Sequence, residues 1–326
     1  MRKVSAKLFR AVGPAPRGSV PPEQRAAVKS AVRRSLGTKA VSITRTPDGH
    51  NSSWFAVAGG DAIVVKATPL AAFEAWACTA ARERGVPAPE VLGLDAGAPA
   101  PFPDGCIVMR RLPGSPLSEV QLSETARTTA LRQAGEILRH VHEVMGAGFG
   151  RPNPVEHGGF GGCHPSWPEA VRDWTGRLLD TVVPDALAPA AADLVRSTID
   201  RHDDVFARCR TSTLVHGDFK PRHVLVSEPT GRVEGIADFG GALFGAPAYD
   251  LAVFWLAESR DVALLIDGYE PDLARRLALI DEARVYRLVR RVARLAWAKM
   301  EGADPAPRRH GLEAEMRDLG IVGAAG

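Results

Sequence analysis

The stretch Leu214–Val226, with the sequence LVHGDFKPRHVLV, and the nearby stretch Val233–Gly240, with the sequence VEGIADFG, decide the fold of this chain. In the first, an apolar entry leads into a His-Gly-Asp turn, and an apolar Val-Leu-Val segment follows. A Glu-Pro-Thr-Gly turn separates that segment from the second stretch, which ends in Asp-Phe-Gly. Two short strands joined by a tight turn would bring three polar side chains into one site: Asp218, His223 and Asp238.

This trio matches the needs of phosphoryl transfer, which requires a carboxylate to orient the attacking hydroxyl and ligands to hold Mg²⁺. The pattern resembles the motif of the aminoglycoside phosphotransferase and protein-kinase-like superfamily, usually His-Gly-Asp, four residues, Asn, then Ile/Val-Asp-Phe/Trp-Gly. The resemblance implies that Asp218 is catalytic and that position 223 and Asp238 hold the metal. It also implies an α+β, bilobal protein-kinase-like fold, with an N-terminal antiparallel β-sheet lobe and a mainly helical C-terminal lobe.

The sequence departs from the family pattern at His223, which stands where Asn is usual. Imidazole can coordinate a divalent ion through one nitrogen, but it is a softer ligand and can be protonated. The alternative is that His223 lies behind the metal, which Asp238, phosphates and water would then hold. Lys220 occupies the place of a lysine in the Ser/Thr-kinase catalytic loop, where it either contacts the γ-phosphate or is solvated.

A lysine at the end of an apolar strand, Ile63-Val-Val-Lys66, resembles the strand lysine that holds the α- and β-phosphates of ATP or GTP. Glu74 lies eight residues further on, in a predicted helix, and would pair with Lys66. For Lys66 taken alone, a solvated lysine at a strand end is the favoured interpretation. The downstream motif favours the phosphate-binding interpretation.

Two further segments are candidates for nucleotide contacts. The polar turn before Trp54 contains Ser52 and Ser53, whose hydroxyls could approach phosphate oxygens, although an ordinary hairpin turn is the alternative. Cys106–Arg111 resembles the hinge strand whose backbone binds the purine edge. Met109 and Arg111 are the positions predicted for that contact. The alternative is that this segment is an ordinary buried strand.

The order of predicted elements supports two lobes. We expect an extension over residues 1–22, a nucleotide-binding lobe over 23–111, and a catalytic and substrate-binding lobe over 112–326. Residues 146–165 are rich in glycine and proline and are predicted to form a long loop. Asp250 is expected to bond back toward the catalytic loop. The His140–His142 pair is not expected to bind metal, because residues two apart do not share a helix face.

The composition is that of an ordinary soluble protein, with 45% hydrophobic and 24% charged residues and a net charge of +3. No window approaches the ~18 apolar residues of a membrane span, and no signal peptide is recognised. The dispersed basic residues argue against a nucleic-acid partner. We therefore expect a cytoplasmic protein whose four cysteines are buried, reduced thiols.

The substrate lobe offers little sign of a site for a polycation. Nine acidic and nine basic residues lie between Asp250 and Glu301. The arginines of Glu282–Met300 are expected to form a solvated helix face. The balance favours a neutral or weakly charged hydroxylated substrate, such as a nucleoside-type antibiotic, over an aminoglycoside.

The leading hypothesis is thus a small-molecule O-phosphotransferase, plausibly one that inactivates an antibiotic. A metabolic kinase acting on a sugar or amino alcohol is the alternative. A catalytically silent nucleotide-binding regulator is a third possibility, which the retention of Lys66, Asp218 and Asp238 disfavours. A protein kinase is disfavoured because the chain runs from Gly240 to Pro247 without an activation loop.

Overall fold

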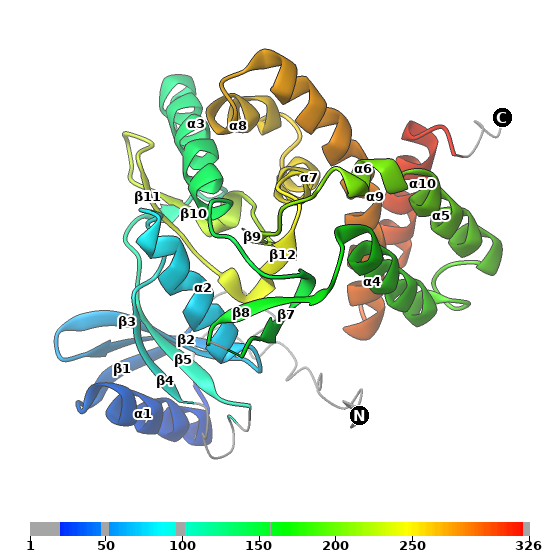
Figure 1. The fold of residues 1–326 in the computed structure, drawn as a ribbon. Coiled ribbons are helices and arrows are strands. Elements are labelled where there is room, and N and C mark those ends of the chain that lie inside the picture. The colour runs from blue at the N-terminus through cyan, green and yellow to red at the C-terminus, as the bar shows by residue number, and fades with distance from the viewer. Residues whose placement is uncertain (1–19, 47–51, 96–101, 103, 157, 322–326) are drawn as a thin grey trace.

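The computed structural model describes residues 20–46, 52–95, 102, 104–156 and 158–321 (Figure 1). Its N-terminal part is a five-stranded antiparallel sheet in the order β1-β2-β3-β5-β4. The strands are β1 (Ala40–Arg45), β2 (Ser52–Ala58), β3 (Asp61–Ala67), β4 (Val91–Asp95) and β5 (Cys106–Arg110). Gly59 and Gly60, both with positive φ, form the tight turn between β2 and β3.

The two faces of this sheet belong to different cores, because successive side chains of a strand point in opposite directions. Ile63 and Val65 of β3 pack with α1 (Pro22–Leu36) in one cluster. Val64 packs instead against the main cluster, which contains α2 (Ala71–Glu83). Lys66 shares the α2 side of β3, so the sheet directs it toward the helix that carries Glu74.

The C-terminal part is mainly helical, and it confirms the expected bilobal α+β arrangement (Figure 1). Its helices are α3 (Glu124–Val141), α4 (Trp167–Val182), α5 (Pro189–Arg201), α6 (Asp203–Ala207), α7 (Ala248–Ala257), α8 (Val262–Tyr269), α9 (Leu273–Met300) and α10 (Ala306–Asp318). One three-stranded sheet joins β6 (Ser115–Pro116), β10 (Val224–Val226) and β11 (Val233–Ile236). A four-stranded sheet joins β7 (Phe149–Pro154), β8 (Phe160–His164), β9 (Thr213–Val215) and β12 (Leu243–Gly245).

Two predictions for this region are wrong. The glycine-rich segment predicted as a loop contains the hairpin β7–β8, whose glycines allow very close packing: a Cβ on Gly162 would lie 2.2 Å from the backbone of Phe149. Helix α9 begins at Leu273 rather than Glu282, because Asp272 caps it by accepting a hydrogen bond from the Arg275 N–H. The early turns of α9 expose Leu273 and Leu277, so they lack the buried apolar stripe that marks the rest of the helix.

Aromatic side chains tie the two lobes together. Phe73 and Trp76 of α2 stack against each other and contact Phe160 of β8 and Phe244 of β12. Ring centroids in this group lie 5.2–6.0 Å apart, which is the usual range for favourable aromatic pairs. Helix α2 is therefore held against the C-terminal lobe, beside the catalytic segments.

The cysteines follow the expectation of buried thiols only in part. All four are free; Cys78 and Cys106 are buried, Cys209 is partly buried, and Cys163 on β8 is exposed. Burial raises the pKa of the Cys106 thiol to about 11, so that thiol is unreactive at neutral pH. Among the described helices, none is long and apolar enough to cross a membrane.

Candidate active site

The segment predicted to be catalytic runs from β9 through the His-Gly-Asp turn to the short 3-10 turn Pro221–His223 and then β10. Gly217 makes this path possible. Its φ is +77°, and a Cβ there would lie 1.9 Å from the carbonyl oxygen of Gly241. Only glycine combines the left-handed conformation with so close a backbone approach, so the turn is pressed directly against the segment after Asp238.

Asp250, at the start of α7, holds the catalytic turn from beneath, as predicted. Its side chain is fully buried and accepts the backbone N–H groups of His216 at 2.7 Å and Gly217 at 2.8 Å. The ring of His142 lies 3.1 Å away through Nε2, and its Nδ1 lies 2.9 Å from the Tyr269 hydroxyl. His142 therefore belongs to this support and not to a site shared with His140.

Lys66 lies between two carboxylates from distant parts of the chain. Its Nζ is 2.8 Å from Glu74 Oε1 and 2.6 Å from Asp238 Oδ1. Burial alone would lower the pKa of Lys66, but the charges of Glu74 and Asp238 outweigh it and raise that pKa above its ordinary value. Asp238 is the one described non-glycine residue with positive φ, at 67°, which turns its carboxylate toward Lys66.

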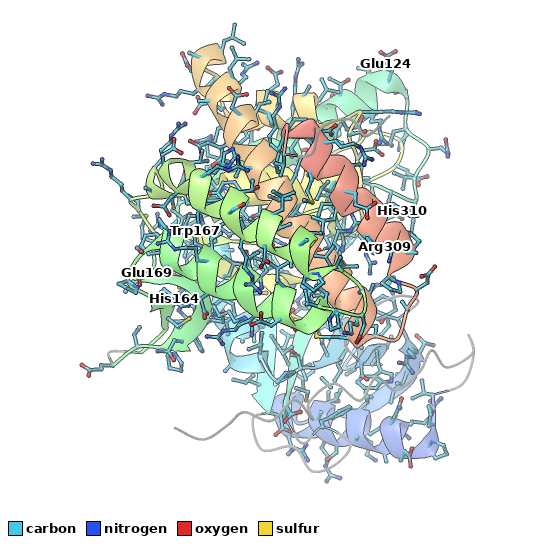
Figure 2. The ribbon with its side chains drawn as sticks, turned by 90° about the vertical axis from the view of Figure 1, so that its right-hand side faces the viewer. Glu124, His164, Trp167, Glu169, Arg309 and His310 are labelled. Carbon is cyan, nitrogen blue, oxygen red and sulfur yellow. The ribbon has the colours of Figure 1, made fainter. Side chains whose placement is uncertain are left out.

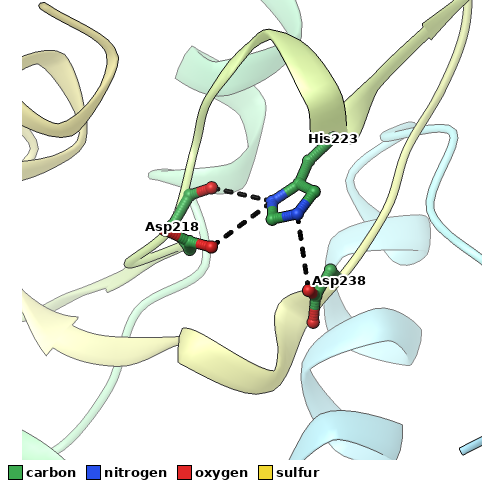
Figure 3. A group of neighbouring side chains, drawn as sticks. All are labelled: Asp218, His223 and Asp238. Carbon is green, nitrogen blue, oxygen red and sulfur yellow. Dashed lines mark hydrogen bonds and ion pairs between the residues drawn. The ribbon is translucent and has the colours of Figure 1, made fainter. Parts of the chain in front are cut away.

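The predicted catalytic carboxylate, Asp218, comes together with the two predicted metal ligands, His223 and Asp238 (Figure 3). Ligand atoms of Asp218, His223 and Asp238 all lie within 4.8 Å of one another. His223 Nδ1 lies 2.9 Å from the backbone carbonyl oxygen of Asp218, so Nδ1 carries the proton and donates it. The unprotonated Nε2 then faces Asp238 Oδ2 at 3.5 Å.

This arrangement fits a divalent cation. Burial lowers the pKa of His223 to about 4 despite the two neighbouring carboxylates, so the ring is neutral at pH 7. The lone pair of His223 Nε2 and the carboxylate oxygen of Asp238 face each other with no proton between them. A metal ion could accept both as ligands. The substitution of His for Asn therefore leaves a usable ligand atom in place.

The carboxylate of Asp218 contacts two cations. Lys220 Nζ lies 2.6 Å from Oδ2, and Arg290 Nη2 of α9 lies 2.8 Å from Oδ1. Burial would raise the pKa of Asp218, but Arg290, His223 and Lys220 together hold it below its ordinary value. Asp218 is thus ionised and ready to accept a hydrogen bond from a hydroxyl.

Comparison with known proteins agrees with this geometry. Residues 43–288, most of the chain, match the model of the phosphotransferase enzyme family that includes the aminoglycoside phosphotransferases. The chain belongs to this phosphotransferase family. No curated protein matches the sequence significantly.

Solved structures show the same fold as this phosphotransferase. The aminoglycoside phosphotransferase APH(4)-Ia, in complex with AMP-PNP and hygromycin B, is 21% identical, with a TM-score of 0.68; the match covers 92% of this chain and 100% of that one. A putative fructosamine-3-kinase from Thermobifida fusca is 18% identical, with a TM-score of 0.64 and coverages of 89% and 98%. The choline kinase of Streptococcus pneumoniae is 15% identical, with a TM-score of 0.62 and coverages of 91% and 99%.

Lys66 and Glu74 belong to the central group, whereas the other residues predicted for nucleotide contacts lie on or beside strands of the N-terminal sheet. Ser52 and Ser53 begin β2, opposite Ala67 and Lys66 of β3, so they are strand residues; the turn before them lies outside the described residues. Met109 is a buried strand residue. The N–H of Arg111 donates to the carbonyl of Ala62 and its guanidinium covers the Phe55 ring at 4.1 Å, so that N–H is not free for a base.

Two residues of the site were not predicted from the sequence. His216 is buried, and its Nε2 lies 3.0 Å from the Ala237 carbonyl, which joins the turn to the strand before Asp238. Arg290 was expected on a solvated face, but only 6% of it is exposed. That expectation is wrong because α9 packs against α7 and α4, and Arg290 meets a carboxylate 72 residues away in the sequence. The sequence did contain a signal for this burial: Arg290 follows Val289 within the apolar stripe of the helix.

Proposed function

We propose that this phosphotransferase moves the γ-phosphate of ATP or GTP to a hydroxyl group of a small molecule that is not a polycation. One observation carries the proposal. The ammonium group of Lys66 contacts both Glu74 and Asp238, and the same Asp238 faces His223 and, through it, Asp218. Four parts of the chain thereby assemble the groups that phosphoryl transfer requires.

Each group has a role that follows from its surroundings. Lys66, held by Glu74, would bind the α- and β-phosphates. Asp238 and His223 Nε2 would hold Mg²⁺, which neutralises charge on the phosphate oxygens when bound. Because the pKa of Asp218 is low, this carboxylate acts mainly by orienting the acceptor hydroxyl and accepts its proton late, as the phosphoryl group arrives.

Lys220 completes the set. Its ammonium group lies on Asp218, and burial, the largest influence, lowers its pKa from the ordinary value. A γ-phosphate next to Asp218 would come within reach of the same flexible side chain, which could stabilise the charge on the transferred group.

The acceptor class follows from the charges around Asp218, where Lys220 and Arg290 lie. Two cations at the catalytic carboxylate disfavour a polyamine acceptor. Inactivation of a non-polycationic antibiotic in the cytoplasm is the leading physiological role. A metabolic kinase is the second candidate, since structures of the same fold include proteins described as a fructosamine kinase and a choline kinase.

The test is Mg²⁺-dependent turnover of ATP and GTP with a panel of hydroxylated antibiotics and metabolites, with mass detection of phosphorylated products. We expect Asp218→Asn to abolish product formation and to retain nucleotide binding. Asp281→Asn is the matched control, because its carboxylate is exposed and pairs only with Arg284 among the described residues. Turnover that survives Asp218→Asn, or nucleotide binding with no turnover at all, would overturn the proposal, and the second result would favour a silent regulator.

A further inference from the structure

One face of α9 brings cationic and aromatic side chains to the catalytic carboxylate. Arg290, Arg294 and Trp297 follow one another at steps of four and three residues, which places them on one side of the helix. The guanidinium of Arg290 lies 4.4 Å from the centre of the Trp297 ring, and its Nη2 contacts Asp218. Arg290 is buried, but Arg294 is partly exposed and Trp297 is 37% exposed, so the C-terminal end of this face is accessible.

Other arginines of α9 are neutralised and are part of the scaffold. Arg287 Nη2 lies 3.0 Å from the buried Glu315 of α10, and Arg291 Nε lies 3.4 Å from the same carboxylate. Arg287 also covers the ring of Trp255 at 4.6 Å. Glu315 therefore ties α10 to α9, which run side by side in the view of Figure 2.

Arg294 has no such partner. In the part of the chain that the structure describes, it forms no ion pair with a carboxylate, and its Nη1 reaches only the Leu256 carbonyl, at 3.4 Å. Burial, followed by the charges of Arg308, Arg291 and Arg290, lowers the pKa of Arg294 to about 10. The carboxylate of Asp218 opposes these charges, but Arg290 already pairs with it, so the half-buried guanidinium of Arg294 lies in a region of net positive potential.

We propose that the acceptor of this kinase carries an oxyanion group, a carboxylate or a phosphate, which Arg294 binds beside Arg290. The proposal rests on the phosphotransferase function above. The acceptor hydroxyl must lie within hydrogen-bond reach of Asp218, so the rest of the molecule meets the α9 face. Arginine binds carboxylates and phosphates through two parallel N–H groups, and a polycation would instead meet the unpaired guanidinium group of Arg294.

The experiment is calorimetric binding to the full-length protein loaded with Mg²⁺ and ADP. The probes are D-glycerate, sn-glycerol 3-phosphate, glycerol and kanamycin, which compare a carboxylate, a phosphate, a neutral triol and a polycation. We expect at least one of the two anions to bind at least ~10-fold more tightly than glycerol, and kanamycin not to bind. The tighter of the two anions identifies the group that the natural acceptor carries.

Variants locate the site. Arg294→Gln is expected to weaken anion binding by ~10-fold or more, whereas Arg284→Gln, at an exposed arginine near the start of the buried part of α9, leaves it unchanged. Equal binding of anions and glycerol, binding of kanamycin, or anion binding unaffected by Arg294→Gln would overturn the inference. Binding of ADP itself is measured first, so a failure of nucleotide binding refutes the proposed function and is distinguished from a failure of anion recognition.

Discussion

The carboxylate of Asp250 offers the sharpest test of how the catalytic turn is supported. Its two oxygens accept the backbone N–H groups of His216 and Gly217 in a fully buried place. In Asp250→Asn one of these oxygens becomes an NH₂ group, so one N–H donor would face another donor. A hydrogen bond to a charged acceptor contributes roughly 1.5–3 kcal/mol, and a buried donor left unpaired costs a similar amount.

We therefore expect Asp250→Asn to lower the free energy of unfolding by about 2–3 kcal/mol. That corresponds to a fall in melting temperature of roughly 4–12 °C for a protein unit of this size. Turnover should fall as well, because Asp218 follows the unsupported turn directly. The side chain keeps its volume in this variant, so no cavity contributes to the loss.

Urea unfolding, followed by circular dichroism and tryptophan fluorescence, measures this effect. Asp281→Asn is the control, since Asp281 is exposed on α9 and such surface changes usually stay within about 0.5 kcal/mol. If the unfolding midpoint of Asp250→Asn equals that of Asp281→Asn, the two N–H contacts do not hold the turn and the reasoning is refuted.

Three further predictions address the rest of the site. Glu74→Gln keeps a hydrogen-bond acceptor for Lys66 but removes the negative charge of the glutamate. The Kd for Mg·ATP measured by calorimetry should therefore rise about 10-fold with the fold intact. An unchanged Kd would contradict the role of Glu74 in orienting Lys66. His223→Ala should raise the Mg²⁺ concentration needed for half-maximal turnover by roughly 10-fold or more. His223→Asn supplies an amide oxygen as a ligand, so its Mg²⁺ requirement should be close to that of the unchanged protein. Equal Mg²⁺ dependence in all three proteins would exclude His223 as a ligand. Gly217→Ala should destabilise the protein by more than about 2 kcal/mol in urea unfolding, whereas Gly37→Ala, at a similar φ in open space, reports the backbone strain alone; equal losses would mean that the clash is absent.

Local patterns predicted much of the architecture. The apolar strand predicted to end in Lys66 is part of β3, and the predicted hinge strand from Cys106 is β5, because apolar patterns act over a few residues. The spacing from Asp218 to His223 and Asp238 likewise lies within one short segment. Its proximity in space follows from the turn between β10 and β11.

Contacts between distant segments were decided only by the tertiary structure. Lys66 meets Asp238 across 172 residues, and no local pattern specifies that meeting. The hairpin β7–β8 carries no strand-like alternation; its glycines admit close backbone contact that only packing reveals.

The sequence by itself determined the family and singled out the candidate residues for phosphoryl transfer, because these reside in residue types at short fixed spacings. It also predicted the Lys66–Glu74 pair, but it could not determine which cations face Asp218. Arg290 reads as one more arginine of a long helix, and becomes a partner of Asp218 only when α9 packs beside the catalytic turn. Electrostatic interaction depends on distance in space and on burial, so the charge of the acceptor site was set by the folded structure alone.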